Sequence, residues 1–281
     1  MVVKLTDVAK LAGVSPTTVS RVINNYGYLS QKTIDKVHQA MEELNYQPNG
    51  LARSLQGKST QLIGLVFPSV SHPFFGELIE TLERKLFVQG YKVILCDSEK
   101  DPEKERAYLR MLAANKVDGV ITGSHNLAIN EYENVSLPIV SFDRFLAPGI
   151  PIVSSQNFQG GQKATEALFA SGAQKIAIIT GANNTGAPSD YRLAGYKQTM
   201  EKYGAEKTIL QIDNGTSTTL IGYDGTKLIK RIAPQLSTIV QPIDEMCDVM
   251  IDLLLRRMKD PDVALEENYP IPIQLSLSES C

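Results

Sequence analysis

The chain has 281 residues, of which 43% are hydrophobic and 21% charged, so it is long enough for two or three folded units with a substantial core. It shows no signal peptide, no apolar run of membrane-spanning length and only three widely spaced cysteines, which predicts a soluble cytoplasmic protein without a disulfide framework. The net charge of −3 hides an asymmetry, because residues 1–58 carry +3 and the remainder −6. A basic first segment on an acidic body predicts a polyanionic partner for that segment.

Capping residues divide residues 1–47 into three short predicted helices. Thr6 is a candidate N-cap for D-V-A-K-L-A, and Ser15 for a second helix with Pro16 at its first position, where a missing N–H costs nothing. Ser30 is a candidate N-cap for a third helix, whose apolar residues recur at helical spacing. Two short helices joined by a glycine-containing turn and braced by a third form a helix-turn-helix.

The second predicted helix has an unusual outer face, rich in hydroxyls and amides with a single guanidinium: Thr17, Thr18, Ser20, Arg21 and Asn24. In a helix-turn-helix the second helix lies in the major groove of DNA, where arginine can bond guanine in a bidentate manner. The sequence therefore predicts base recognition by this face. The alternative is an ordinary solvated helix face.

Residues 48–60 contain Pro48 and Gly50, followed by L-A-R-S-L, which could form barely two helical turns. So short a helix is marginal in isolation and could order only with a partner. A plain tether between domains is the other interpretation.

Residues 61–281 alternate short apolar runs with amphipathic stretches, as in L-I-G-L-V-F followed by F-F-G-E-L-I-E-T-L-E-R-K-L-F. This alternation indicates βαβ units and an α/β fold with a parallel sheet, in which ligands bind beyond the carboxyl ends of the strands. Near the end of the chain, an amphipathic helix is expected from Ile243 to about Met258, followed by a proline-containing edge strand.

Several stretches resemble the lac repressor family of bacterial transcription regulators. They are T-D-V-A-K-L-A-G-V-S-P-T-T-V-S-R-V-I-N-N, N-Y-Q-P-N-G-L-A-R-S-L, I-V-S-F-D-R, N-F-Q-G-G, Y-R-L-A-G-Y and L-I-G-Y-D-G. Within that family, S-F-D-R-F-L-A-P-G-I-P-I-V-S-S and A-P-Q-L-S-T-I-V-Q-P are similar to sucrose operon repressors of Gram-positive bacteria. The resemblance implies a helix-turn-helix head, a hinge helix and a two-lobed effector domain like that of periplasmic sugar-binding proteins.

For the head, the resemblance implies contacts with operator DNA. The positions that match recognition-helix, phosphate-contacting or backbone-facing positions are Leu5, Thr6, Ser15, Pro16, Thr17, Thr18, Ser20, Arg21, Asn24, Tyr28, Ser30, Thr33 and Tyr46. Asn49, Ala52 and Leu55 match the hinge helix, which in this family orders on operator DNA. There, paired leucines from two subunits wedge into the minor groove, and Leu55 is the matching residue. This wedge requires a homodimer on a palindromic operator.

For the body, the resemblance implies a sugar site between two lobes. The expected effector-binding positions are Phe74, Phe75, Ser124, Asp143, Arg192 and Asp224. An aromatic face covers the C–H groups of a sugar, and carboxylates accept hydrogen bonds from its hydroxyls. Taken singly, an aspartate at a strand end is commonly a helix cap, and Arg192 could form a structural ion pair.

One departure from the family pattern falls between Ser217 and Leu220. There the chain lacks roughly 40–50 residues, somewhat more than one βαβ unit, that in the family supply a helix, an inner strand and a second helix. We expect the C-terminal lobe to lose an inner strand, unless the segment is simply absent from the sequence at hand.

These observations predict a dimeric, sequence-specific repressor of a sugar-utilisation operon, with a sugar or sugar phosphate as effector and sucrose as the expected sugar. A catabolite-control-type regulator with a phosphoprotein corepressor is the alternative. An enzyme is disfavoured because the chain has three histidines and no nucleophile elbow, phosphate loop or zinc spacing, so no catalytic residue, metal or cofactor is expected. A transport binding protein would leave the basic head unused.

Overall fold

The computed structural model describes residues 3–23, 26–46, 59–99, 101–124, 126, 130–180, 187–211 and 222–280. Asn24 and the three hinge positions Asn49, Ala52 and Leu55 lie outside these residues. The chain divides into two compact units, Met1–Thr60 and Gln61–Cys281, which we call the head and the body.

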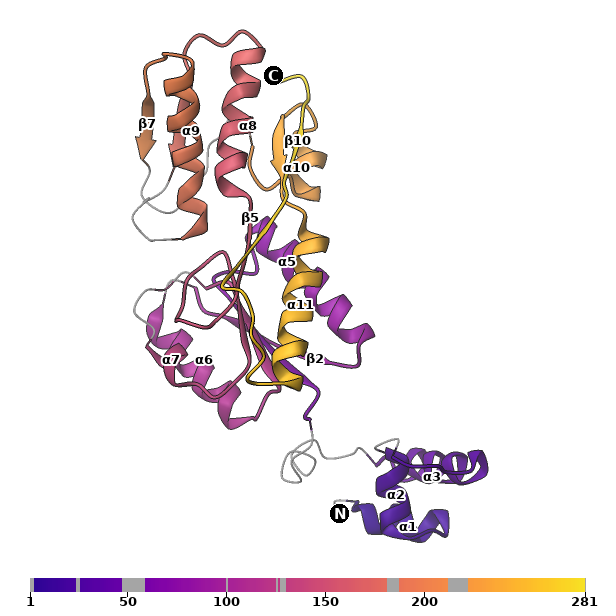
Figure 1. Cartoon of the computed structure of the whole chain (residues 1–281). Helices are drawn as coiled ribbons and strands as arrows, with labels where there is room; N and C mark the ends of the chain where they lie inside the picture. The colour runs from indigo at the N-terminus through magenta and orange to yellow at the C-terminus, as the bar shows by residue number, and fades with distance from the viewer. Residues whose placement is uncertain are drawn as a thin grey trace. The chain divides into compact units, whose positions relative to one another are not determined.

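The head contains three short helices, α1 (Leu5–Ala12), α2 (Pro16–Ile23) and α3 (Gln31–Glu43) (Figure 1). Val8, Val19 and Val37, one from each helix, are fully buried at the centre of their shared core. Gly13 ends α1 with a left-handed backbone (φ 67°), which lets the chain turn sharply into α2. The predicted helix-turn-helix is therefore confirmed.

Two of the three predicted caps form. The Ser15 hydroxyl accepts the Thr18 N–H at 3.1 Å, and the Ser30 hydroxyl accepts the Thr33 N–H at 3.3 Å. The predicted Thr6 cap is wrong, because α1 begins earlier, with Lys4 as its N-cap. The Asp7 carboxylate accepts the Lys4 N–H at 2.8 Å, which closes the first turn and leaves Thr6 inside the helix.

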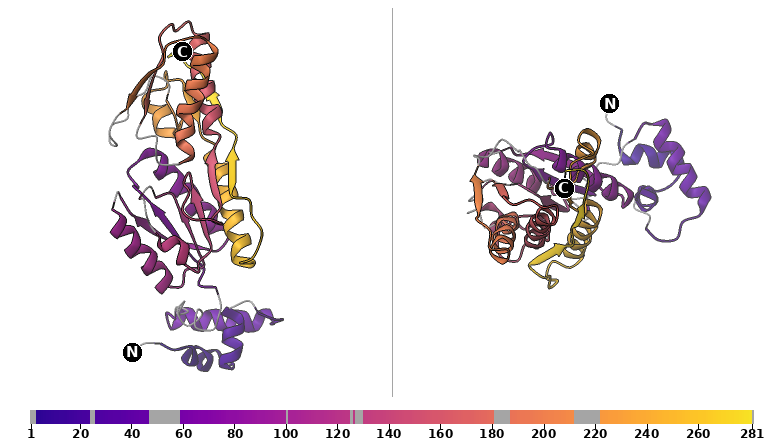
Figure 2. Two further views of the ribbon diagram at one scale, coloured as in Figure 1. Left: turned by 60° about the vertical axis from the view of Figure 1, so that its left-hand side comes forward. Right: turned by 90° about the horizontal axis from the view of Figure 1, so that it is seen from above.

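The body has two lobes, and the chain passes between them after β5, after β8 and after β9 (Figures 1 and 2). The N-terminal lobe contains β1 (Leu62–Phe67), α5 (Pro73–Val88), β2 (Lys92–Asp97), α6 (Pro102–Ala114), β3 (Gly119–Thr122), α7 (Glu131–Asn134), β4 (Ile139–Phe142), β5 (Ile152–Ser155), α11 (Ile243–Lys259) and β9 (Asn268–Ile271). The C-terminal lobe contains α8 (Asn157–Ala170), β6 (Ala177–Thr180), the 3-10 turn η1 (Pro188–Asp190), α9 (Tyr191–Lys202), β7 (Thr208–Gln211), α10 (Lys227–Ile232), β8 (Thr238–Val240) and β10 (Gln274–Ser276).

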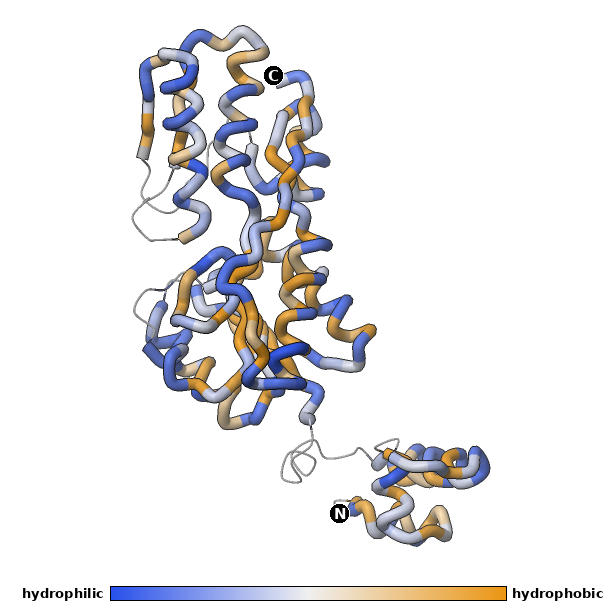
Figure 3. Tube along the Cα trace, in the orientation of Figure 1, coloured by the Kyte–Doolittle hydropathy of each residue, from blue (hydrophilic) through white to orange (hydrophobic). Residues whose placement is uncertain are grey.

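The N-terminal lobe is built on one parallel sheet of six strands in the order β2-β1-β3-β4-β5-β9. One apolar cluster joins the sheet to α5 and α11, and a second joins its other face to α6 and α7. Figure 3 shows apolar residues along these strands and along α11. A parallel sheet covered by helices on both faces confirms the predicted α/β class. The proline-containing β9 forms the predicted edge strand.

The C-terminal lobe has no continuous sheet among the described residues. β6 pairs in parallel with β7, and β8 pairs antiparallel with β10, as two separate two-stranded sheets. The core beneath β6 and β7 is thin: Ile176, Tyr196 and Met200 are its buried members, while Ile209 and Leu210 of β7 are 39% and 51% exposed. Among the described residues the sheet is therefore interrupted between the β6–β7 and β8–β10 pairs, and the stretch in which the sequence predicts a missing inner strand lies outside those residues.

Candidate DNA-binding surface and effector site

The outer face of α2 is exposed, as expected for a recognition helix. Val19 and Val22 point into the head core, whereas Pro16, Thr17 and Arg21 face solvent. Tyr28, just after α2, is fully exposed and leaves a large aromatic ring without packing of its own.

The remaining predicted head positions fall into three groups. Thr6, Ser15 and Ser30 are exposed, and Thr18, Ser20 and Thr33 are half-buried. Leu5 and Tyr46 pack against the head core, and burial raises the pKa of the Tyr46 hydroxyl. Both side chains therefore contribute to the packing of the head, whether or not they also contact the DNA backbone.

Three predicted or neighbouring polar side chains meet between the lobes of the body. Asp143 follows β4, Asn157 begins α8, and Arg192 lies in the first turn of α9. The Asn157 amide donates to the Asp143 carboxylate at 3.1 Å, and its carbonyl oxygen accepts from Arg192 Nε at 2.7 Å. Asn157 thus links a residue of the N-terminal lobe to one of the C-terminal lobe.

Tyr223 completes this cluster from the segment before α10. The Arg192 guanidinium lies 3.6 Å from the centroid of the Tyr223 ring, a cation–π contact, and the Tyr223 hydroxyl donates to Asn157 Oδ1 at 3.3 Å. Because its Nε is bonded and its plane is stacked, Arg192 is held in one orientation with its terminal nitrogens available to a ligand.

The two predicted carboxylates share an uncommon backbone conformation. Asp143 has φ 52° and Asp224 has φ 84°, both in the left-handed region, which is sparsely populated outside glycine and clusters at ligand sites. Burial raises the pKa of Asp143 to about 6, although Arg192, Asn157 and Ser189 lower it. Asp224 is held by Gln241, whose amide donates to it at 2.6 Å.

The remaining predicted effector residues differ in how accessible they are. Phe75 is half-buried and lies edge-on to Phe74 and tilted against Phe67, so part of its ring can face a ligand. Phe74 is 4% exposed within the core, and Ser124 is 1% exposed with its hydroxyl donated to buried Glu105. Phe74 and Ser124 are therefore almost fully enclosed by protein and offer little surface to a ligand.

Close contact between α8 and α9 sets the position of Arg192. A Cβ at Gly161 would lie 2.1 Å from the Arg192 carbonyl oxygen, and one at Gly195 would lie 2.1 Å from the Phe158 carbonyl oxygen. Only glycine permits the two helix backbones to approach this closely, and the approach brings Arg192 within reach of Asn157.

Sequence reasoning missed Asn157, Tyr223 and Gln241. Each lies in or beside a stretch that carries the family resemblance, but an asparagine at a helix start is commonly a cap, and a tyrosine or glutamine near a strand end has no chemical signature of its own. The signal that could have found Asn157 and Gln241 is their position just after the carboxyl ends of β5 and β8, whereas Tyr223 follows only an isolated bridge at Gly222.

Within the described part of the chain, no cluster of His, Cys, Asp or Glu could hold a metal ion, and every helix is too short or too polar to cross a membrane. A helix-turn-helix head followed by a two-lobed body with a polar cluster between its lobes is the architecture of DNA-binding regulators controlled by a small ligand.

Comparison with known proteins identifies the family. Residues 4–49 match the family described as "Bacterial regulatory proteins, lacI family", and residues 60–259 match "Periplasmic binding proteins and sugar binding domain of LacI family". A sucrose operon repressor of Streptococcus mutans is 47% identical over 100% of both chains, and one of Pediococcus pentosaceus is 46% identical over 97% of both. The chain belongs to the LacI family of transcriptional repressors, and its relatives are regulators rather than enzymes.

The fold agrees with a solved member of the family. The lac repressor dimer bound to operator and an anti-inducer superposes with a TM-score of 0.81 at 23% identity, covering 100% of this chain and 99% of that one. The alignment with the Streptococcus mutans relative spans 321 positions, whereas this chain has 281 residues, so roughly 40 positions face a gap. The expected shortening of the chain is therefore confirmed. Its predicted position, between Ser217 and Leu220, lies outside the described residues.

Proposed function

We propose that this protein represses a sucrose-utilisation operon as a homodimer on a palindromic operator, and that a sugar bound between the lobes of the body lowers its operator affinity. Full-length similarity to sucrose operon repressors supports the operon. The observation that carries sugar control is the cluster of Asp143, Asn157, Arg192 and Tyr223, which joins both lobes and leaves donors and acceptors for hydroxyl groups.

Control follows from linkage between the two sites. A ligand that bonds to residues of both lobes favours one arrangement of the lobes, and can shift operator affinity only as far as it distinguishes that arrangement from the other. In the head, the outer face of α2, with Thr17, Ser20 and Arg21, would read bases, and Leu55 would wedge into the minor groove.

The residues of the polar cluster lie outside the shortened stretch of the C-terminal lobe, although in the family the missing strand also supplies pocket residues. Asn157, Arg192, Tyr223 and Asp224 all come from segments on either side of the shortened stretch. We therefore expect sugar response to persist with a less stable lobe.

The test is fluorescence anisotropy of a labelled palindromic operator titrated with protein, with and without sucrose, fructose and their 6-phosphates, at two salt concentrations. Phosphate contacts make affinity fall with salt, so a salt-dependent baseline is expected. Specific binding that a sugar relieves supports the proposal. Specific binding that no sugar or sugar phosphate changes contradicts sugar control and favours a corepressor protein.

A further inference from the structure

Glu77 on α5 has a carboxylate whose polar partners come from the other lobe of the body. Its Oε2 accepts the backbone N–H of Lys227, the first residue of α10, at 3.0 Å, and its Oε1 lies 3.6 Å from Lys227 Nζ. The Glu77 side chain is 16% exposed and that of Lys227 is 78% exposed, so the bond to the backbone N–H is the more sheltered contact. A carboxylate with so little exposure needs hydrogen-bond partners, and among the described residues Lys227 supplies them.

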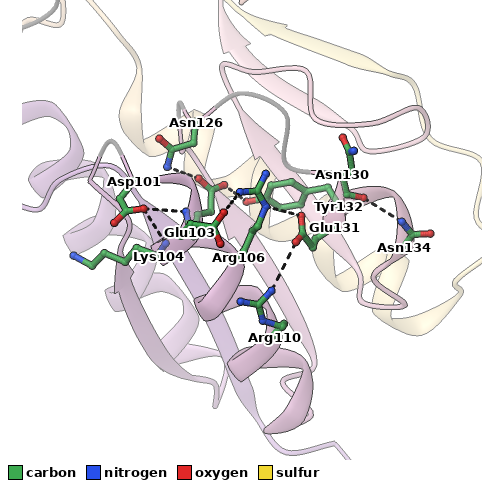
Figure 4. A network of polar contacts seen from close by, with 11 residues as sticks. Asp101, Glu103, Lys104, Arg106, Arg110, Asn126, Asn130, Glu131, Tyr132 and Asn134 are labelled. Carbon is green, nitrogen blue, oxygen red and sulfur yellow. Dashed lines mark hydrogen bonds and ion pairs between the residues drawn. The ribbon is translucent and has the colours of Figure 1, made fainter.

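The contact between Glu77 and Lys227 crosses from one lobe to the other. By contrast, the ion pair of Arg106 with Glu131 joins α6 to α7 within the N-terminal lobe (Figure 4), and another pair joins α9 to α8 within the C-terminal lobe. Pairs of that kind move with their lobe. The bond between Glu77 and Lys227 changes whenever the lobes shift relative to one another, so it stabilises one arrangement of the lobes.

Little else fixes the start of α10. The helix has six residues, none of them buried, and the side chains of Leu228 and Ile232 are exposed. The Thr226 hydroxyl accepts the Ile229 N–H at 3.3 Å, and the first turn contains no acidic residue. The Glu77 carboxylate therefore supplies, from α5, the negative charge that stabilises a helix N-terminus.

Two residues, Gly225 and Thr226, separate this anchored helix start from Asp224, an expected effector contact. Asp224 and Gly225 both have a left-handed backbone, with φ 84° and 56°, and a Cβ at Gly225 would lie 2.9 Å from Val240 Cα. Gln241 also holds the Asp224 carboxylate at 2.6 Å. Because this turn has little freedom of its own, a displacement of the first residue of α10 displaces Asp224 as well.

We propose that Glu77 is a positioning residue for the effector site, which holds Asp224 in place through α10 and favours the arrangement of the lobes to which sugar binds. The inference rests on the proposed function. In the same arrangement, Asn157 bonds Asp143 of one lobe and Arg192 of the other. The Glu77 bond and a sugar in that cluster therefore favour the same state. Without the bond, a smaller fraction of the molecules is ready to bind sugar, and the apparent affinity falls with that fraction.

Two substitutions at Lys227 separate its backbone contact from its side-chain contact. Lys227→Pro removes the donated N–H, and proline is tolerated here because Lys227 is the first helical residue and Thr226 before it is extended, with ψ 155°. Lys227→Met removes the exposed ammonium and keeps the N–H. We expect about three- to tenfold weaker sugar binding from Lys227→Pro and from Glu77→Ala, and a much smaller loss from Lys227→Met.

Isothermal titration calorimetry of the full chain with sucrose, fructose and their 6-phosphates measures these affinities without DNA. Glu77→Ala and Lys227→Pro remove the same bond, so the double variant should bind no more weakly than either single variant, whereas unrelated structural damage would add. Glu77→Gln keeps a neutral acceptor and should lose less affinity than Glu77→Ala. Glu80→Ala, exposed about one turn further along α5, is the matched control and should bind as the wild type does.

Hydrogen exchange of the sugar-free chain tests the positioning itself. Glu77→Ala should speed amide exchange in residues 224–232 about three- to tenfold, because the start of α10 loses its anchor on α5. Glu80→Ala should leave this exchange unchanged. A general loss of stability would instead speed exchange throughout both lobes.

The outcomes separate this inference from the proposed function. Additive losses in the double variant overturn the inference, as does exchange around α10 that Glu77→Ala leaves unchanged. Wild-type sugar affinity in both Glu77→Ala and Lys227→Pro overturns it as well. If Lys227→Pro does not fold, the two Glu77 variants and the exchange measurement decide. Weaker sugar binding in these variants, without sugar-dependent release of the operator by the wild type, overturns the proposed function alone. A wild type that binds none of these sugars overturns both.

Discussion

Asp143→Asn should stabilise the protein at neutral pH while weakening its binding of sugar. Burial holds the pKa of Asp143 at about 6, above the 3.8 of an exposed aspartate. The folded state therefore binds a proton more tightly than the unfolded state, and this group's contribution to stability falls as pH rises from about 4 to about 6. With a pKa of about 6 in the folded state and 3.8 in the unfolded state, the ionised carboxylate lowers the free energy of unfolding by roughly 3 kcal/mol at pH 7 and by about half as much at pH 5. Asparagine, which stays neutral, avoids that cost.

Urea unfolding followed by circular dichroism measures this effect. The stability gained by Asp143→Asn should be largest at pH 7 and about half as large at pH 5, while calorimetry at pH 7 should show at least about tenfold weaker sugar binding because an acceptor for hydroxyls is lost. Asp101→Asn, at the exposed N-terminus of α6, is the control, because an exposed carboxylate carries no cost of burial. A difference in stability that is the same at both pH values would refute the reasoning, since titration of Asp143 is its only source.

Three further predictions concern the head, the hinge and the contact between helices. Arg21→Ala should reduce discrimination between operator and random DNA about tenfold or more while sparing sugar binding; equal operator affinity in mutant and wild type contradicts base recognition by Arg21. Leu55→Ala should keep the fold but weaken and unbend the operator complex, and an unchanged bend angle in circular-permutation gel shifts argues against the wedge. Gly161→Ala should cost roughly 1–3 kcal/mol or more and weaken sugar binding, because its Cβ would meet the Arg192 carbonyl oxygen at 2.1 Å; wild-type unfolding and affinity would disprove that constraint.

Local chemistry explains the features that could be predicted from the sequence. Ser15 and Ser30 cap their helices because a hydroxyl before a helix satisfies an N–H that has no other partner, and this needs no tertiary contact. Ile243 begins the long helix α11, which ends at Lys259, one residue beyond the expected end. Thr6 is not a cap because α1 already begins at Leu5, and the carboxylate of Asp7, the third residue of the helix, accepts the Lys4 N–H and closes the first turn.

Tertiary contacts explain the features that could not be predicted. Ser124 has the position of an effector contact, but its hydroxyl is used by Glu105, which in the sequence is one of several charges on an amphipathic helix. Asn157 bonds both Asp143 and Arg192 only because α8 and α9 approach through two glycines. Neither partnership follows from spacing along the chain, since the residues involved are 14 to 35 positions apart.

The interrupted sheet and the intact polar cluster have one explanation. An inner strand contributes most to a lobe through its two buried faces, so its loss would divide the sheet, and among the described residues β6–β7 and β8–β10 are separate pairs. The cluster, by contrast, is held by α8, α9 and the segment before α10, whose contacts to one another and to Asp143 do not pass through that strand. Loss of the strand therefore lowers the stability of the C-terminal lobe more than it changes the geometry of the site. A ligand that bonds to both lobes would stabilise such a lobe in proportion to its affinity, because binding and folding of the lobe are then linked.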